Sequence, residues 1–257
     1  MTQNRIVFGN RQDWYQHIVT KLSCSNVPVP ELLNITHATN SDIVIPIDLS
    51  DYEILRANTL FLKKSLFPSS DCVQICNDKK LFREWFVKHF SDDYLPSKNK
   101  KSQFSIAKPR IGLAGQGSFL IENSNLEKIA NIELNSQYCL EDYIPGSAEF
   151  SYHLLFDQDQ IIFSAKASFE HKSEVYIHGS DYHDYSTSLE TMIEVPEIFY
   201  QLLSKLNYSG TACIDYKIDE TGQIKILEIN PRMGWSLIQC INPYIDAYTN
   251  HIKNKYS

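Results

Sequence analysis

The chain has 257 residues, of which 43% are hydrophobic and 12% aromatic, enough apolar material for one large domain or two small ones. A formal net charge of −7 gives no general electrostatic case for binding nucleic acid or an anionic membrane. No apolar stretch reaches the roughly 18 residues of a membrane-spanning helix. We also expect no secretory leader before the first strand, and six cysteines without zinc-like spacing favour a reducing, cytoplasmic location.

Residues 1–76 alternate between short apolar runs and amphipathic segments. The apolar runs predict strands and the amphipathic segments predict helices, the second of them capped by Ser50. The predicted strands are Arg5–Phe8, Asp42–Ile47 and Cys72–Cys76, and the predicted helices run from Asp13 to about Leu22 and from Ser50 to about Lys64. This order predicts a short α/β domain with a small parallel sheet.

The rest of the chain predicts a small α+β unit followed by a mostly antiparallel sheet. In the first unit we expect a helix over 78–89, a strand at Phe104–Lys108, a loop and strand over 116–121, and a helix over 124–134. From Gln137 on we expect the antiparallel sheet, with a helix around residues 187–206. A closing helix should begin at Asn242-Pro243, with an N-cap and an N1 proline, and end near Lys253.

A glycine-rich loop follows the predicted strand that ends at Lys108. Residues 112–118 read GLAGQGS, and glycines let successive backbone N–H groups approach phosphate oxygens. The loop lacks the Gly-Lys-Ser/Thr ending of a P-loop, which disfavours a Walker-type NTPase. Lys108 would direct a compact positive charge at the phosphates. A flexible connector beside a solvent-facing lysine is the alternative.

A hairpin near the end of the chain gathers polar side chains among apolar ones. Two alternating runs, 211–218 and 223–229, flank a polar turn that contains glycine. Antiparallel pairing can bring Asp215 and Glu228 side by side, with Asn230 on the same face as Glu228. Carboxylates among apolar residues are costly unless paired or metal-bound, and hard divalent ions prefer oxygen ligands. The pattern therefore predicts a Mg²⁺ site, with ordinary surface acids as the alternative.

Four sequence blocks, taken in order, resemble those of the ATP-grasp superfamily. The string LEINPR, with an Asp thirteen residues before its Glu, resembles the family's metal-binding end. A second block, Ser105–Pro109 followed by RIGLAGQGS, resembles the family's phosphate-binding lysine and its mobile loop. A third, YCLEDYIPG at residues 138–146, resembles the hinge that holds adenine. A fourth, Asn77-Asp78-Lys79, resembles the site of the first nucleotide lysine. Together they cover roughly residues 73–237, and four blocks in order are specific where one would be weak.

The resemblance implies an α+β ATP-grasp fold, in which two α+β subdomains grip ATP, preceded by the short α/β domain of residues 1–76. The ATP-grasp domain would span 77–257, with a lid subdomain over about 77–136 and an antiparallel-sheet subdomain over about 137–257.

The resemblance also implies a set of site residues. Mg²⁺, with Mn²⁺ as an alternative, would be held by Asp215, Glu228 and Asn230. Arg232 and Lys108 would be catalytic. ATP would be bound by Lys79, Lys108, Gly115, Gly117, Ser118, Glu141, Tyr143, Ile144, Glu149 and Leu227. Within this set, the main chain of Tyr143 and Ile144 would meet the adenine edge, Glu141 its exocyclic amine, and Glu149 the ribose.

The activity implied by the resemblance is ATP-dependent carboxylate–amine ligation. A carboxylate would become an acyl-phosphate, with ADP and phosphate as products, and would then be joined to an amine, as in an amino-acid or sugar-acid amide ligase of bacterial biosynthesis. A small-molecule kinase of the same fold and a nucleotide-binding module without turnover are the alternatives. The expected partners are a small-molecule carboxylate and an amine, without nucleic acid or membrane, and a homodimer is left open.

Four further residues receive no assigned role. Lys166 lies in an alternating run and either contacts a ligand or remains on the surface. His171, His178 and His183 lack zinc spacing, so they belong either to a solvated loop or to the acceptor pocket.

Overall fold

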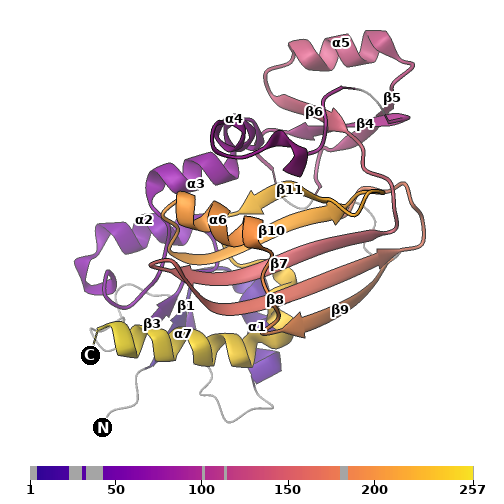
Figure 1. Cartoon of the computed structure of the whole chain (residues 1–257). Coiled ribbons are helices and arrows are strands. Elements are labelled where there is room, and N and C mark those ends of the chain that lie inside the picture. Colours follow the sequence, from indigo (N-terminus) through magenta and orange to yellow (C-terminus); the bar gives the residue numbers. More distant parts are fainter. Residues whose placement is uncertain are drawn as a thin grey trace.

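The computed structural model describes residues 5–22, 31–32, 43–99, 102–112, 115–179 and 185–256. In these ranges the chain forms a three-stranded parallel sheet, a three-stranded antiparallel sheet and a five-stranded antiparallel sheet, all packed with helices (Figure 1). This arrangement confirms the predicted α+β fold with a small N-terminal parallel sheet. No helix in the described ranges has both the length and the apolar character needed to cross a membrane.

The parallel sheet is built around β1 (Ile6–Phe8), which pairs with β2 (Glu31–Leu32) on one side and β3 (Ile43–Ile45) on the other. Helix α1 (Gln12–Leu22) buries Trp14, Ile18 and Leu22 in the same core as β1 and β3. The prediction of a third strand at Cys72–Cys76 is wrong. Those residues belong to α3 (Ser70–Asn77), where Ser69 caps the helix and the two cysteines, one turn apart, bury one face.

The helix predicted from Ser50 to Lys64 is shorter than expected. Helix α2 (Leu49–Ala57) begins at the cap Asp48, whose side chain accepts the Ser50 amide, while Asp51 accepts the Asp48 amide at 2.8 Å. This reciprocal capping box fixes the start two residues before the predicted cap. The helix ends at Ala57, and a 3₁₀ turn, η1 (Thr59–Phe61), follows.

The unit predicted to be a lid lies at the top of Figure 1 and contains a three-stranded antiparallel sheet. Strand β4 (Phe104–Pro109) lies between β5 (Phe119–Glu122) and β6 (Tyr138–Asp142), and α5 (Leu126–Leu134) covers the sheet through a small core of Ala107, Ile121 and Ile129. Helix α4 (Lys79–His89), capped by Asp78, precedes this sheet and is followed by the 3₁₀ turn η2 (Asp92–Tyr94). The proposed domain boundary after residue 76 falls at the end of α3.

The large sheet has the strand order β11-β10-β7-β8-β9. Its strands are β7 (Ala148–Asp157), β8 (Gln160–His171), β9 (Tyr185–Thr191), β10 (Gly210–Ile218) and β11 (Ile224–Asn230). The helix expected over 187–206 is only partly correct: its first part is β9, and α6 (Glu197–Lys205) begins after Pro196. The Ser- and Thr-rich segment Tyr185–Thr191 pairs with β8 along its whole length, which overrides any helical spacing.

Two helices cover opposite faces of the large sheet. Helix α6 packs on one face with Tyr152, Leu154 and Ile214, and α7 (Ile241–Lys255) packs on the other with Leu155 and Phe163 (Figure 1). Helix α7 continues from the 3₁₀ segment η3 (Trp235–Cys240), so it begins one residue before Asn242 and has no side-chain cap, contrary to the prediction. The preceding turn already continues the backbone, so no cap is needed there.

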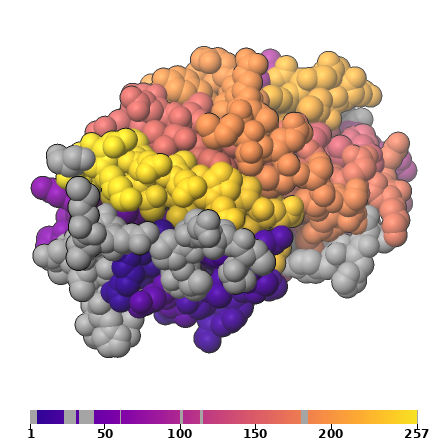
Figure 2. Space-filling model, turned by 90° about the horizontal axis from the view of Figure 1, so that it is seen from below, coloured from indigo at the N-terminus to yellow at the C-terminus, as the bar shows by residue number. Residues whose placement is uncertain are grey.

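The N-terminal sheet and α7 share one hydrophobic core. The Tyr248 hydroxyl donates to the Val44 carbonyl at 3.1 Å and accepts the Leu66 amide at 2.6 Å. The Tyr52 hydroxyl donates to the Pro231 carbonyl at 2.6 Å across 179 residues of chain. Figure 2 shows α7 lying between the N-terminal part and the strands of the large sheet. These contacts fix the segment that follows β11 against the N-terminal unit.

Candidate active site

A cavity of about 500 Å³ is lined by both the lid and the large sheet. Its walls come from the end of β4 and the glycine-rich loop, from the hinge after β6, from β10 and β11, and from the start of α1. All but two of the predicted site residues line this cavity; they are Lys79, Lys108, Gly115, Ser118, Tyr143, Ile144, Glu149, Asp215, Leu227, Glu228, Asn230 and Arg232. The exceptions are Gly117, which lies in the loop just before Ser118, and Glu141.

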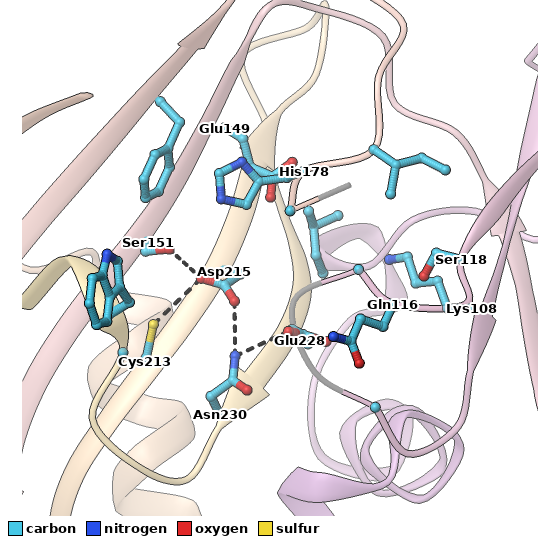
Figure 3. A pocket seen from close by; sticks show the side chains of 18 of the residues that line it. Lys108, Gln116, Ser118, Glu149, Ser151, His178, Cys213, Asp215, Glu228 and Asn230 are labelled. Atoms are coloured by element: carbon cyan, nitrogen blue, oxygen red, sulfur yellow. Dashed lines mark hydrogen bonds between the residues drawn. The ribbon is translucent and has the colours of Figure 1, made fainter. Parts of the chain in front are cut away.

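The hairpin places its polar side chains as the sequence predicts. Asp215 on β10 is the direct partner of Glu228 on β11, and a register shift follows between Asp215 and Tyr216. The Asn230 side-chain amide donates to Asp215 at 2.9 Å and to Glu228 at 3.1 Å, and the Ser151 hydroxyl donates to the other oxygen of Asp215 (Figure 3). The three predicted metal ligands therefore form one connected cluster.

The two carboxylates of this cluster have opposite pKa shifts. Burial, reinforced by the neighbouring Glu228, raises the pKa of Asp215 to about 8. Burial also tends to raise the pKa of Glu228, but Lys79 at 2.8 Å, with Lys108 and Asn230, outweighs it and lowers that pKa to about 2. Burial and the repulsion between two adjacent carboxylates thus favour the neutral form of Asp215, and a bound cation would favour its charged form.

This donor set fits a hard divalent cation. The described residues contain no group of three or more His, Cys, Asp and Glu suited to a metal, so an ion here would use two carboxylates, one amide and oxygens of a bound ligand. Asn230 would have to turn its amide so that Oδ1, rather than Nδ2, faces the carboxylates. Such mixed shells are typical of Mg²⁺ with nucleotide phosphates.

Lys108 is held at the cavity wall by an acid behind it. Its ammonium contacts Glu141 at 3.1 Å, and Glu141 also accepts from Arg83 at 3.4 Å. Burial tends to lower the pKa of Lys108, but Glu141 and Glu228 outweigh it and raise that pKa, so the lysine stays charged. Glu141 lines a separate cavity of about 250 Å³, and its carboxylate pairs with Lys108 and Arg83; its contact with adenine stays a prediction.

The hinge offers main-chain groups at one end of the cavity. The Tyr143 amide donates to the Phe104 carbonyl at 2.9 Å, so a nucleobase would meet the Tyr143 carbonyl or the main chain of Ile144. Consecutive residues of β10, Asp215 and Tyr216, pair with Glu228 and Ile226 of β11, so Leu227 between them is an extra residue in the ladder. Leu227 lines the cavity. Burial raises the pKa of Glu149 to about 7, although Lys217 and Lys108 counteract it.

The glycine-rich loop touches a second loop over the cavity. Gly115 and Gly117 have φ values of +69° and +73°, which side chains rarely adopt, and the Ser118 amide donates to the Gly115 carbonyl at 3.0 Å. A Cβ on Gly115 would lie 2.3 Å from the His178 carbonyl oxygen. The predicted loop residues 113–114 lie outside the described ranges.

The far end of the cavity is formed by the start of α1 and by η3. The Arg232 guanidinium donates to the Met233 carbonyl at 2.9 Å and lies 5.8 Å from the Trp14 ring centroid, while Arg11 lies 4.3 Å from the same ring. Trp235 contacts Trp14 edge-on at 5.4 Å. Sequence reasoning missed Arg11, Trp14 and Trp235, because nothing local to α1 shows that it meets the C-terminal segment.

Buried partners behind the cavity were also missed. His153 on β7 is fully buried; its Nε2 lies 2.7 Å from the Ser236 hydroxyl, its Nδ1 has no partner in the described structure, and burial lowers its pKa to about 3. Lys217 is 3% exposed and lines the cavity two residues after Asp215. The alternation of β10 predicts the side of the sheet on which Lys217 lies, but not its burial.

The residues without an assigned role fall in different places. Lys166 lies outside the cavity and pairs with Glu190 at 3.2 Å. His171 and His178 face each other at 3.1 Å, and His178 lines the cavity, where burial lowers its pKa to about 4. His183 lies outside the described residues.

The chain belongs to the ATP-grasp family: the family's domain model matches residues 76–236, more than half of its length. Its fold is similar to that of D-alanine–D-alanine ligase from Bacillus anthracis, with a TM-score of 0.62 at 16% identity, covering 98% of this chain and 100% of the other. It is also similar to the ATP-grasp ligase PsnB in complex with a minimal precursor, with a TM-score of 0.56 at 14% identity, covering 96% of this chain and 98% of the other. The D-cycloserine synthetase DcsG has a similar fold, with a TM-score of 0.55 at 9% identity, covering 90% of this chain and 93% of the other. No curated protein matches in sequence.

Proposed function

We propose that this chain is a cytoplasmic ATP-dependent ligase that activates a small-molecule carboxylate as an acyl-phosphate and joins it to an amine. The observation that carries the proposal is the Asp215–Glu228–Asn230 cluster, which faces Lys79, Lys108 and the glycine-rich loop across one cavity. Members of this family are ATP-dependent enzymes, and one solved relative, PsnB, has been seen with Mg and ADP.

The proposal assigns the binding roles as follows. ATP would lie between the lid, residues 77–136, and the large-sheet unit, residues 137–257, with its base at the hinge and its phosphates beside Lys79, Lys108 and the loop amides of residues 115–118. Asp215, Glu228 and Asn230 would hold Mg²⁺ or Mn²⁺, which neutralises phosphate charge when bound. The carboxylate substrate would lie at the far end, near Arg232.

The chemistry then needs no protein nucleophile. A carboxylate oxygen of the substrate attacks the γ-phosphorus, the bond to the β-phosphate oxygen breaks, and ADP leaves. Lys108 and Lys79 stabilise the charge that develops on the phosphoryl oxygens. The amine nitrogen then attacks the acyl carbon, phosphate leaves, and the amine loses a proton. Arg232 stabilises the oxyanion of this second step, and closure of the loop excludes water.

A substrate screen tests the proposal. Pairs of carboxylates and amines are incubated with Mg-ATP, and ADP and phosphate are measured with each component omitted in turn. A ligase should need both substrates, and a carboxylate alone with hydroxylamine should give a hydroxamate. Turnover that needs only one substrate and yields its phosphorylated form would indicate a kinase. AMP and pyrophosphate as products would contradict the acyl-phosphate route, and ATP binding without turnover with any pair would indicate a binding module.

A further inference from the structure

Lys217 is a buried cation that the roles above do not use. It lies on β10, where Tyr216 pairs with Phe150 of the neighbouring strand β7. The next residues along the two strands are Lys217 and Glu149, which are therefore neighbours across the sheet. Because side chains alternate along a strand, Lys217 lies on the same face as Asp215. Both side chains line the nucleotide cavity. A lysine that is only 3% exposed must gain compensating contacts, because burial disfavours its charge.

The contacts of Lys217 are mainly with the hinge. Its ammonium donates to the Gly146 carbonyl at 2.8 Å and lies 4.4 Å from the ring centroid of Tyr176 and 5.2 Å from that of Tyr143. The Tyr143 hydroxyl donates to the Glu174 carbonyl and accepts the Tyr176 amide, so the Tyr143 ring is fixed in turn. The ammonium is therefore held in place at the hinge end of the cavity.

Glu149 and Lys217 are neighbours but form no direct ion pair in the described structure. Among the ion pairs of the described residues, none joins these two side chains, although opposite charges on neighbouring strands commonly meet. Among the described residues Lys217 makes one hydrogen bond, to the Gly146 carbonyl, so other donors of its ammonium could meet a ligand. An ionised carboxylate can only accept. A hydroxyl group placed between them could accept from the ammonium and donate to the carboxylate.

We propose that Lys217 is a specificity-determining residue that, together with Glu149, recognises a ribose hydroxyl of the nucleotide. This inference rests on the proposed function, since it requires ATP to bind in the cavity. The ammonium donates to the hydroxyl oxygen, and the hydroxyl hydrogen is donated to Glu149. Both bonds involve a charged group, so losing the hydroxyl should weaken binding about tenfold or more.

The test is calorimetry of Mg-ATP, 2′-deoxyATP and 3′-deoxyATP with the full chain and its variants. The wild type should bind at least one deoxy analogue about tenfold more weakly than ATP. Lys217→Met keeps the length and apolar stem but has no donor, so it should bind ATP more weakly and discriminate less between ATP and that analogue. Lys217→Arg should retain discrimination. Lys225→Met is the matched control. Lys225 on β11 pairs directly with Lys217 in the sheet, but its ammonium contacts Asp93 and Asp219 instead of the cavity. Its loss should leave the ratio of ATP affinity to deoxy-analogue affinity unchanged.

The outcomes separate the two proposals. If the wild type does not bind Mg-ATP, both the proposed function and the ribose role of Lys217 are wrong. If it binds ATP but neither analogue is weakened, or if Lys217→Met discriminates as the wild type does, only the ribose role is overturned. A purely structural Lys217 would weaken all three nucleotides equally. Should Lys217→Met fail to fold by circular dichroism, Glu149→Gln decides instead: reduced discrimination supports the bridging hydroxyl, and unchanged discrimination overturns it.

Discussion

Lys79 at the start of α4 and Glu228 on β11 form an ion pair of 2.8 Å that bridges the two sides of the cavity. Both side chains are proposed to serve the bound nucleotide, Lys79 at a phosphate and Glu228 at the metal. Without ligands they neutralise each other, and this contact contributes to the low pKa of Glu228. Binding of Mg-ATP must therefore exchange one set of charge pairs for another.

This exchange predicts opposite effects of Lys79→Met on two ligands. Binding of Mn²⁺ alone should become several-fold tighter, because the lysine no longer competes for the carboxylate. Binding of Mg-ATP should become several-fold weaker, because a phosphate contact is lost. Calorimetry with each ligand measures both, and Lys80→Met, the next residue along α4 but outside this cavity, is the control. Weakening of both ligands would show that Lys79 does not compete with the metal.

Glu228→Gln should reduce ATP turnover by about a hundredfold or more, because the metal site loses a charged ligand while the shape of the side chain is kept. ADP formation across a Mg²⁺ titration measures the effect. Glu220→Gln, an exposed acid in the turn of the same hairpin, should have no effect. A folded Glu228→Gln protein with wild-type turnover would contradict the assignment of this carboxylate.

Lys108→Ala should weaken binding of ATP far more than binding of adenosine, since its charge is aimed at phosphates. Calorimetry with ATP, AMP and adenosine provides the comparison, and Lys166→Ala is a control outside the cavity. Glu141→Gln should have a smaller effect of the same kind, because it loosens Lys108 without removing its charge. Equal losses for adenosine and ATP would indicate that Lys108 is structural.

Two glycines with similar backbones give a matched test of loop contact. Gly115 and Gly222 both have positive φ, but a Cβ on Gly115 would meet the His178 carbonyl at 2.3 Å, whereas one on Gly222 would meet nothing within 4 Å. Alanine should cost about 1 kcal/mol of backbone strain at either position. Only Gly115→Ala should also slow turnover sharply, by separating the two loops over the cavity.

Turnover at saturating substrate and the free energy of unfolding, measured on both variants, check this prediction. Hydrogen exchange should in addition show protection of residues 115–118 on adding Mg-ATP but not on adding adenosine. Equal turnover of the two alanine variants would mean that the contact with His178 has no functional role.

His153 predicts a pH dependence of stability. Its pKa is about 3 in the folded chain, because burial disfavours the charged ring, and about 6.5 when unfolded. Between these values the unfolded state binds more protons, so the free energy of unfolding falls as the pH drops from about 6.5, by up to about 1.4 kcal/mol per pH unit. Urea unfolding between pH 7.5 and 4.5 should show this slope in the wild type, reduced by that amount in His153→Gln. Parallel curves would contradict it.

The hairpin was predictable because its information is local. Alternation fixes which face Asp215, Glu228 and Asn230 occupy, and a short polar turn between two runs fixes that they pair. The run Cys72–Cys76 was misassigned because a short apolar stretch suits both a strand and a helix, and the cap at Ser69 decides between them.

What could not be predicted depends on tertiary contact. Trp14 belongs to an ordinary amphipathic helix, with Arg11 just before it, until the fold places Arg232 over the Trp14 ring that Arg11 also contacts. The pairing of Glu141 with Lys108 likewise depends on the register of β6 with β4, which sets the two side chains near each other. Neither spacing nor composition carries such information.

The core shared by the N-terminal sheet and α7 bears on how the chain folds during synthesis. Strands β1 and β3 are synthesised well before α7, which supplies apolar side chains to the core that they share. The hydrogen bond from Tyr248 to Val44 spans 204 residues, so it can form only after Tyr248 has been synthesised. We expect the nascent N-terminal sheet to remain incompletely packed until α7 has left the ribosome.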